Sequence, residues 1–145
     1  MTVFDLIKKI ETTEIDSNKI NMVEAVYGEI YSDTARKLIS VKLGDLEDRQ
    51  LYSYYQDAFK VRLLSPFEMV ANKDFIEDIM PDKALVPFII WGELDIICYD
   101  TEEDEWVDLE TESCEIAQSE VDFIDVARTL HEALPDVNPG LKNQF

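Results

Sequence analysis

The stretch that decides the fold is LVPFIIWGELDIICYDTEEDEWVDLE, residues 85–110. It contains two apolar runs, Val86–Trp91 and Leu94–Tyr99, which are separated only by the dipeptide Gly92-Glu93. Both runs are rich in β-branched and aromatic residues, which are enriched in strands, and a two-residue connection that contains glycine is typical of a tight turn. The stretch therefore predicts an antiparallel β-hairpin at the centre of the protein.

A third strand and a closing helix are expected beyond the hairpin. The acidic turn Thr101–Glu105 leads to the predicted strand Trp106–Leu109. A last helix is expected to start at Ser119, with Asp122 at the capping-box position, and to end before Pro135. The apolar residues that this helix should bury are Phe123, Ile124, Ala127, Leu130 and Leu134.

The chain ahead of the hairpin begins with helical patterns. Val3–Ile10 repeats apolar residues at helical spacing, with Thr2 available as the N-cap. A second helix is predicted after Asp16, and Gly28 suits its C-terminal end. Ser32 can cap a third helix. The N-terminal part is therefore expected to be helical.

A short strand and two further helical turns are expected between these helices and the hairpin. Phe59, Val61 and Leu63 alternate with polar residues, which is the period of a strand with one wetter face. The segment Ser65–Glu68 then places a capping serine, a proline and a glutamate where a helix start needs them. A further helical turn should run through Phe75, Ile76 and Ile79.

The order of these elements predicts an α+β fold. An antiparallel sheet should be flanked by the N-terminal helices and by the long C-terminal helix. A chain of 145 residues is long enough to bury the core of one domain. We expect a single domain over residues 1–135 and a C-terminal tail over residues 136–145.

The charge of the chain limits the partners that it can bind. The sequence has 13 Lys and Arg against 32 Asp and Glu, a formal net charge of −19. Between Ala84 and Ala127 there are 14 carboxylates and no Lys or Arg. Nucleic acid is not an expected direct partner, because phosphate binding needs a basic surface.

The sequence also bears on where the protein is found. The lysines of Met1–Ile10 lie inside an amphipathic pattern, and no apolar run approaches the 18 or so residues of a membrane span. Cys98 and Cys114 lack the spacing of a zinc or redox motif. We expect a cytoplasmic protein with reduced thiols and no membrane partner, although a bridge between the two cysteines stays open.

No catalytic motif stands out. His131 is the only histidine, and the four glycines are too scattered to hold a phosphate. Asp100, Glu102 and Asp104 are spaced like the first ligands of a calcium-binding loop, but a glutamate occupies the position that needs glycine. We therefore expect neither an enzyme nor a cofactor, while a carboxylate-based metal-dependent enzyme stays open as a less favoured alternative.

The acidic stretch has two interpretations. It can be a solvated surface that keeps the protein dissolved, or a surface that attracts a basic partner and speeds its association. For the second interpretation Trp106 is the best candidate for an aromatic anchor, whereas Trp91 and Tyr99 are expected in the core. The candidate partner-binding residues are Asp100, Glu102, Glu103, Asp104, Glu105, Trp106 and Asp108.

The sequence also resembles a known family. The run LVPFIIWGELDIICYD, the acidic turn, Trp106 and the run IAQSEVDFIDVARTL from Ile116 resemble the C-terminal half of the SUKH superfamily. The resemblance covers about Tyr27 to Leu134 and is weaker in its first half, where the glycine pair usual after an early helix is missing. The matching positions are Pro87, Phe88, Asp95, Tyr99, Asp100, Trp106, Ile116, Ala117, Ser119 and Phe123.

This resemblance implies an α+β binding module. The superfamily includes a yeast regulator of cell-wall synthesis and many bacterial immunity proteins, which neutralise toxins that are often nucleases. The resemblance thus implies an immunity protein that binds a basic toxin domain, and the charge independently favours a basic partner. A regulatory or scaffold binding domain with the same fold stays open, as does a weak homodimer.

Overall fold

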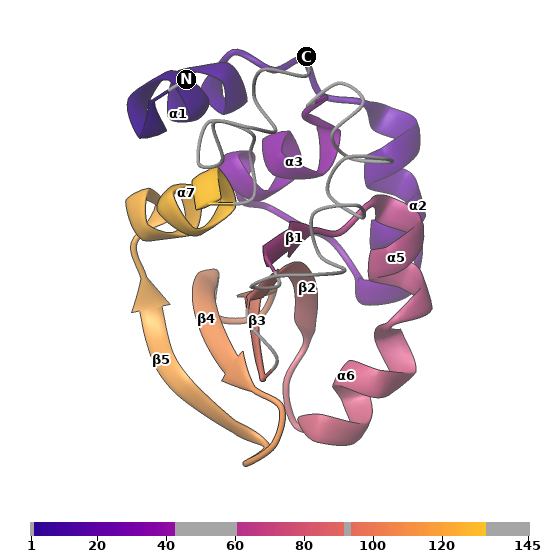
Figure 1. Cartoon of the computed structure of the whole chain (residues 1–145). Coiled ribbons are helices and arrows are strands. Elements are labelled where there is room, and N and C mark those ends of the chain that lie inside the picture. The colour runs from indigo at the N-terminus through magenta and orange to yellow at the C-terminus, as the bar shows by residue number, and fades with distance from the viewer. Residues whose placement is uncertain (1, 43–60, 92–93, 133–145) are drawn as a thin grey trace.

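The computed structural model describes residues 2–42, 61–91 and 94–132. Within them the chain forms an α+β domain, as predicted (Figure 1). Along the sequence, helices come before β1, between β1 and β2, and after β5. The helices are α1 (Val3–Glu11), α2 (Ser17–Tyr27), α3 (Asp33–Ser40), α5 (Pro66–Ala71), α6 (Lys73–Ile79) and α7 (Phe123–Glu132). The strands are β1 (Val61–Leu63), β2 (Leu85–Trp91), β3 (Asp95–Asp100), β4 (Glu105–Glu110) and β5 (Glu115–Val121).

The strands form one antiparallel sheet in the order β1-β2-β3-β4-β5, so each strand pairs with its neighbour in sequence. The predicted hairpin is confirmed, because β2 pairs with β3 from Leu85 opposite Asp100 to Trp91 opposite Asp95. The predicted third strand is also confirmed as β4, which places Trp106 opposite Tyr99. The dipeptide Gly92-Glu93 lies outside the described residues.

The prediction for the last helix is wrong at its start. Ser119 lies in strand β5, and the helix begins only at Phe123. The backbone carbonyl of Asp122 accepts hydrogen bonds from the N–H groups of Asp125 and Val126, at 2.9 and 3.2 Å. The serine-to-aspartate spacing imitates a capping box, but the backbone of this segment pairs with β4 instead, so tertiary pairing overrides the local signal.

The predicted helix starts are confirmed by their caps. The Thr2 hydroxyl accepts from the Asp5 N–H while the Asp5 carboxylate accepts from the Thr2 N–H, a complete capping box on α1. Ser65 and Glu68 form the same arrangement on α5, with Pro66 at the first helical position. Caps of this type satisfy N–H groups that the helix itself leaves without partners.

The two middle helix starts are also as predicted. The Asp16 carboxylate accepts from the N–H groups of Asn18 and Lys19, and the Ser32 hydroxyl accepts from the Ala35 N–H. The predicted helical turn through Phe75, Ile76 and Ile79 is confirmed as helix α6. Three expected features, Phe59, Leu134 and the tail over residues 136–145, lie outside the described residues.

Gly28 ends α2 in a conformation that only glycine adopts readily. Its φ is 91° and its ψ is −179°, and its N–H donates to the carbonyl of Glu24 at 2.8 Å. A Cβ built at this position would meet no atom within 4 Å. The requirement for glycine therefore comes from the backbone conformation and not from crowding.

Replacing Gly28 with alanine is expected to lower the free energy of unfolding by about 1–3 kcal/mol, because a side chain disfavours this region of φ and ψ. Urea denaturation measures the loss. Asn21→Ala, at an exposed position of the same helix, is the matched control and should change stability by no more than about 0.5 kcal/mol. A Gly28→Ala loss as small as that of the control would contradict this account.

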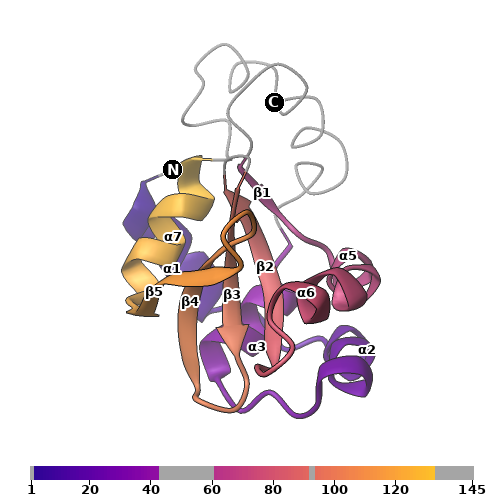
Figure 2. The same ribbon diagram turned by 90° about the horizontal axis from the view of Figure 1, so that it is seen from below.

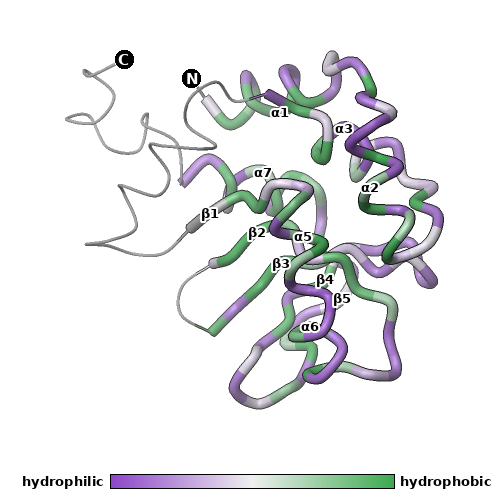
Figure 3. The backbone as a smooth tube through the Cα atoms, turned by 90° about the vertical axis from the view of Figure 1, so that its right-hand side faces the viewer, coloured by the Kyte–Doolittle hydropathy of each residue, from purple (hydrophilic) through white to green (hydrophobic). Residues whose placement is uncertain are grey.

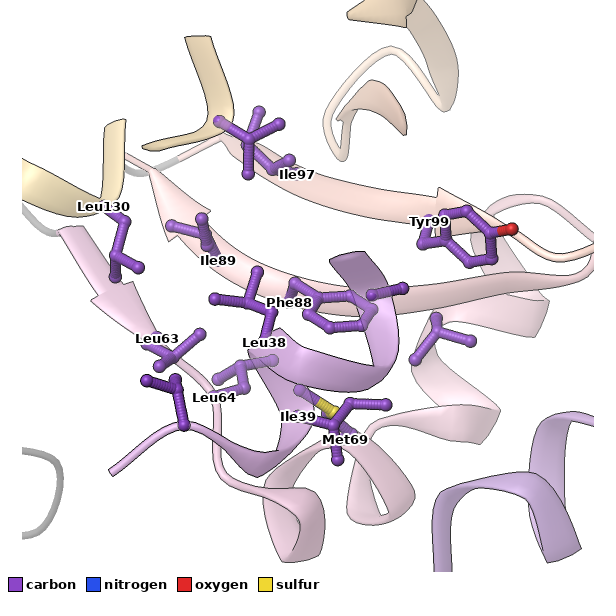
Figure 4. Close-up of a cluster of buried hydrophobic side chains, with 14 of the residues drawn as sticks. Leu38, Ile39, Leu63, Leu64, Met69, Phe88, Ile89, Ile97, Tyr99 and Leu130 are labelled. Atoms are coloured by element: carbon purple, nitrogen blue, oxygen red, sulfur yellow. The ribbon is translucent and has the colours of Figure 1, made fainter. Parts of the chain in front are cut away.

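The main core fills the space between the sheet and the helices. Leu38 and Ile39 of α3 and Leu130 of α7 meet the side chains of β2 and β3 there (Figure 4). Phe88 and Ile89 of β2 are wholly buried at the centre of this cluster. The helices α1, α2 and α5 contribute further buried side chains, so this core ties every described helix except α6 to the sheet.

A second, smaller core lies on the opposite side of the strands. Ile96 and Cys98 of β3 and Val107 and Leu109 of β4 pack together with Ile76 of α6. The alternation of side chains along a strand sends these residues away from the main core. Buried hydrophobic residues therefore lie on both faces of the sheet, and the colouring of Figure 3 shows β2 and β3 as mainly hydrophobic segments.

The helices form two groups. Helix α7 packs against α1 and contacts β1 and β2. Helices α5 and α6 contact β2, and α2 contacts α5 and lies beyond it in the view from below (Figure 2). Because the short β1 pairs only with Ile89–Trp91, the rest of β2 is left for α5 and α6 to contact. Among the described residues, no helix combines the length and apolar character needed to cross a membrane.

Candidate acidic interface

The turn between β3 and β4 is organised by Asp100. This residue is 1% exposed, and its Oδ1 accepts hydrogen bonds from the N–H groups of Glu102 and Glu103, at 2.9 and 3.1 Å. Its Oδ2 lies 3.6 Å from the Lys83 Nζ. Asp100 therefore holds the turn in shape, and it presents almost no surface to a partner.

A second contact fixes the far side of the same turn. The hydroxyl of the buried Tyr99 donates a hydrogen bond to Asp104, whose backbone has a φ of 52°. Burial, and then this hydrogen bond with its negative charge, raise the pKa of Tyr99. Aspartate tolerates the left-handed region better than most residues, so the turn depends on Asp104 for both backbone and side chain.

Trp106 does not have the exposure expected of an aromatic anchor, and that expectation is wrong. It is 6% exposed and contacts Phe88 and Tyr99 edge-to-face, with ring centroids 4.9 and 5.4 Å apart. Its ring also stacks on Phe123 of α7 at 6.2 Å. The residue turns inward because β4 alternates its side chains and Trp106 falls on the main-core face. The expected core positions of Tyr99 and, in part, Trp91 are confirmed.

Asp108 is also buried, at 9% exposed. It lies opposite Ile97, on the same face of the sheet as the main core. Burial, and then the nearby Asp95, raise the pKa of Asp108 to about 6. Like Asp100, it is not part of the accessible acidic surface, so the structure divides the candidate residues into a buried and an accessible group.

The accessible group gathers around a shallow hollow of about 360 Å³. Glu103, Asp104 and Glu105 line it from the turn, and Glu120 lines it from β5. Glu102 is exposed on the same turn. The apolar part of the lining comes from Trp106 and Val121, which pair across β4 and β5. We call Glu102, Glu103, Asp104, Glu105 and Glu120 the acidic rim.

Glu120 belongs to this surface because of an irregularity in β5. The register shifts between Trp106 and Asp108, where the segment of β5 from Gln118 to Val121 has more residues than the facing part of β4. Glu120 has a φ of 52°, which fits a bulge that redirects a side chain. The sequence prediction missed Glu120 because it placed this segment in a helix start, and no local signal marks the bulge.

The acidic rim can accept hydrogen bonds from a cationic group. The described residues 84–91 and 94–127 contain no Lys or Arg, so no cation of that part of the sequence neutralises the rim. Carboxylates that converge on one hollow suit the planar fork of an arginine or the ammonium group of a lysine. The surface is thus suited to binding a basic side chain, while nothing in its geometry provides a nucleophile with an adjacent base.

Other groups considered in the sequence are placed elsewhere. Cys98 is buried in the second core and Cys114 is exposed beyond β4, and both thiols are free. Burial raises the pKa of the Cys98 thiol. Within the described ranges, no three His, Cys, Asp or Glu side chains are arranged to hold a metal ion. His131 lies on α7, away from the acidic turn in sequence and half-buried.

A larger open hollow, of about 640 Å³, lies at the connection between α1 and α2. Its lining includes Lys9 and Lys42 together with Asp16 and Ser40. The Ser40 hydroxyl accepts a hydrogen bond from the Asp16 N–H at 2.9 Å. Asp16 and Ser40 are therefore already engaged, because they bind each other and Asp16 caps α2.

Comparison of the chain with protein-family models, with curated proteins and with solved structures finds no match in any of the three.

Proposed function

We propose that this protein is an acidic binding module that neutralises a basic toxin domain by direct contact, as an immunity protein does. The observation that carries the proposal is the acidic rim, where five carboxylates from the β3–β4 turn and from β5 lie around or beside one shallow hollow. Many toxins that cut nucleic acids are basic where they hold their substrate. An acidic surface can cover such a site and exclude the substrate.

The resemblance to the SUKH superfamily supports the same proposal. Of the ten positions that carry it, Phe88, Tyr99, Trp106 and Phe123 lie in or against the main core, whereas Ala117 and Ser119 are exposed on β5. Such residues specify a fold more than a function. The class of partner is what the resemblance implies, and the negative charge of the surface favours a partner with a basic surface. A cytoplasmic location fits this role, because an immunity protein must meet the toxin inside the cell that it protects.

The direct test is to coexpress the chain with the product of the adjacent reading frame. We expect a complex that weakens steeply as salt is raised, because the attraction between exposed charges is screened within about 10 Å at 0.1 M salt. We also expect the toxin activity of that product to fall when the complex forms. A complex that leaves the activity intact would instead favour a regulatory or scaffold domain, and the absence of any complex would overturn the proposal.

A charge reversal at the rim tests where the partner binds. Glu102→Lys with Glu103→Lys is expected to slow association about tenfold or more at low salt, because steering by opposite charge is lost. Both side chains are exposed, and it is their backbone N–H groups that Asp100 binds, so the fold should persist. Asp104 is left unchanged because Tyr99 donates to it. Stopped-flow or surface-binding kinetics measure the rates.

The matched control is Glu112→Lys with Glu115→Lys. These residues are exposed at the β4–β5 connection, at the opposite end of β4 from the acidic turn. The control changes the net charge of the protein by the same amount as the rim variant. Equal slowing in both variants would show that only the overall charge matters, and it would contradict binding at the acidic rim.

A further inference from the structure

Three acids lie together on the main-core face of β3 and β4. The register places Asp95 opposite Glu110 and Ile97 opposite Asp108. Ile97 belongs to the main core, and residues two apart on a strand share a face, so Asp95, Asp108 and Glu110 share the face of Ile97. Asp95 and Asp108 are diagonal neighbours across the two strands, which is within reach for side chains on one face.

Asp108 is held in a setting that disfavours its charge. It is 9% exposed, and its Oδ1 is inaccessible and has no hydrogen-bond partner among the described residues. The carboxyl groups of Asp95 and Asp108 are close enough to interact through a hydrogen bond, which contributes to the pKa shifts of both. An ionised carboxylate can only accept, so a hydrogen bond between two carboxyl groups requires one of them to carry a proton.

The groups around the pair add negative charge. Burial, and then Glu110, raise the pKa of Asp95, and burial followed by Asp95 raises that of Asp108 to about 6. Cys98 of β3 is close enough for Asp108 to affect its thiol. On β5 the neutral Gln118 lies opposite Asp108. The neighbours of the pair on β3, β4 and β5 are therefore acids and neutral groups.

Helix α7, one of the helices packed on this core, provides no cation that offsets them. The titratable residues of α7 are Asp125, Arg128, His131 and Glu132, and Arg128 forms an ion pair with Asp125 at 3.2 Å. Both partners of that ion pair are exposed. None of these α7 groups is among the causes of the shifts at Asp95 and Asp108, which are burial and the carboxyl groups themselves.

We infer that Asp95 and Asp108 form a proton-sharing pair that makes the fold more stable in mild acid than at neutral pH. With one shared proton the pair carries a single negative charge and is internally hydrogen-bonded. Without it, two negative charges are held close together on the buried face of the sheet. The two groups titrate as a unit, so the proton belongs to the pair and not to either residue alone.

The direction of the effect follows from proton linkage. Asp108 has an ordinary value of 3.8 in the unfolded chain and a pKa of about 6 in the fold. As the pH falls through about 6, the folded protein takes up a proton that the unfolded chain binds only near 3.8, so folding becomes more favourable. Above about pH 6 both carboxyl groups of the pair are ionised, so the pair lowers the stability of the folded protein most in that range.

Asp108→Asn tests the inference. Asparagine keeps the shape of the carboxyl group, and its amide can donate to Asp95 at every pH as the shared proton does only in mild acid. The variant is expected to melt several degrees above the parent protein at about pH 7.5 and at nearly the same temperature at about pH 5. Thermal melts followed by circular dichroism across this range give the comparison.

Glu112→Gln is the matched control, because it removes one negative charge at an exposed position beyond β4. Its melting temperature should follow that of the parent across the whole range, which separates the pair from the general self-repulsion of an acidic chain. The inference is overturned if Asp108→Asn melts at or below the parent near neutral pH, or if its advantage is the same at both pH values.

A second measurement works on the unmodified protein. Carbon-13 NMR of the aspartate carboxyl groups should show Asp108 titrating above about pH 5, together with a linked change at Asp95. This titration tests whether Asp95 and Asp108 share a proton even if the Asp108→Asn variant fails to fold. A carboxyl signal of Asp108 that titrates below about pH 4.5 would mean that the two groups do not share a proton at the pH of the cell.

Discussion

Replacing Trp106 with alanine is expected to lower the free energy of unfolding by about 3–5 kcal/mol. The indole ring is 6% exposed and contacts three other aromatic rings, those of Phe88, Tyr99 and Phe123. Removing it leaves a cavity between the sheet and α7, and the surrounding rings lose both packing and edge-to-face contacts. Urea denaturation followed by circular dichroism measures the loss without relying on tryptophan fluorescence.

The same substitution separates a core residue from an interface anchor. If Trp106 were an anchor on the surface, its removal would change stability by no more than about 0.5 kcal/mol and would reduce partner affinity instead. Trp106→Phe is the control, because it keeps an aromatic ring and should lose clearly less stability than the alanine variant. A near-neutral alanine variant would contradict the packing described for β4.

Phe88 is the position where a second large loss is expected. Its side chain is wholly buried, and it faces Trp106 edge-to-face at 4.9 Å. Phe88→Ala should lower the free energy of unfolding by about 3–5 kcal/mol, since a large buried ring is deleted from an interior strand of the sheet. Phe67→Ala is a suitable control, because Phe67 is a phenylalanine that is 74% exposed.

A double-mutant cycle at the two positions isolates their mutual contact. Phe88→Leu and Trp106→Phe, alone and together, keep enough volume for the protein to fold. Because edge-to-face rings contribute about 0.5–1.5 kcal/mol beyond burial, a coupling energy in that range is expected. Strictly additive losses would show that the two rings act only through the area that each buries.

Much of the fold could be predicted because its signals are local. Two apolar runs around a glycine indicate the hairpin. The caps at Thr2, Ser32 and Ser65 are hydrogen bonds between a side chain and the backbone a few residues away. Gly28 could be placed at the end of α2 because few other residues suit that conformation. In each case the physical cause lies within a few residues of the feature, so the sequence contains it directly.

The missed features depend on pairing between distant segments. β5 has mostly exposed side chains and lacks the alternation of apolar residues that marks a strand, so only its pairing with β4 identifies it. The burial of Trp106 depends on which face of β4 meets the helices. The four acidic residues that precede Trp106 in the sequence indicate an exposed segment instead. Glu120 reaches the acidic rim through a bulge that no local pattern predicts.

The irregular backbone of β5 also limits how this protein can meet other chains. β5 is the last strand of the sheet, and its two shifts of register interrupt the even row of N–H and C=O groups that an added strand would need. Charged side chains at Glu115 and Glu120 further discourage such pairing. A partner is therefore expected to recognise side chains at the end of the sheet, and copies of this chain should resist joining edge to edge into fibres.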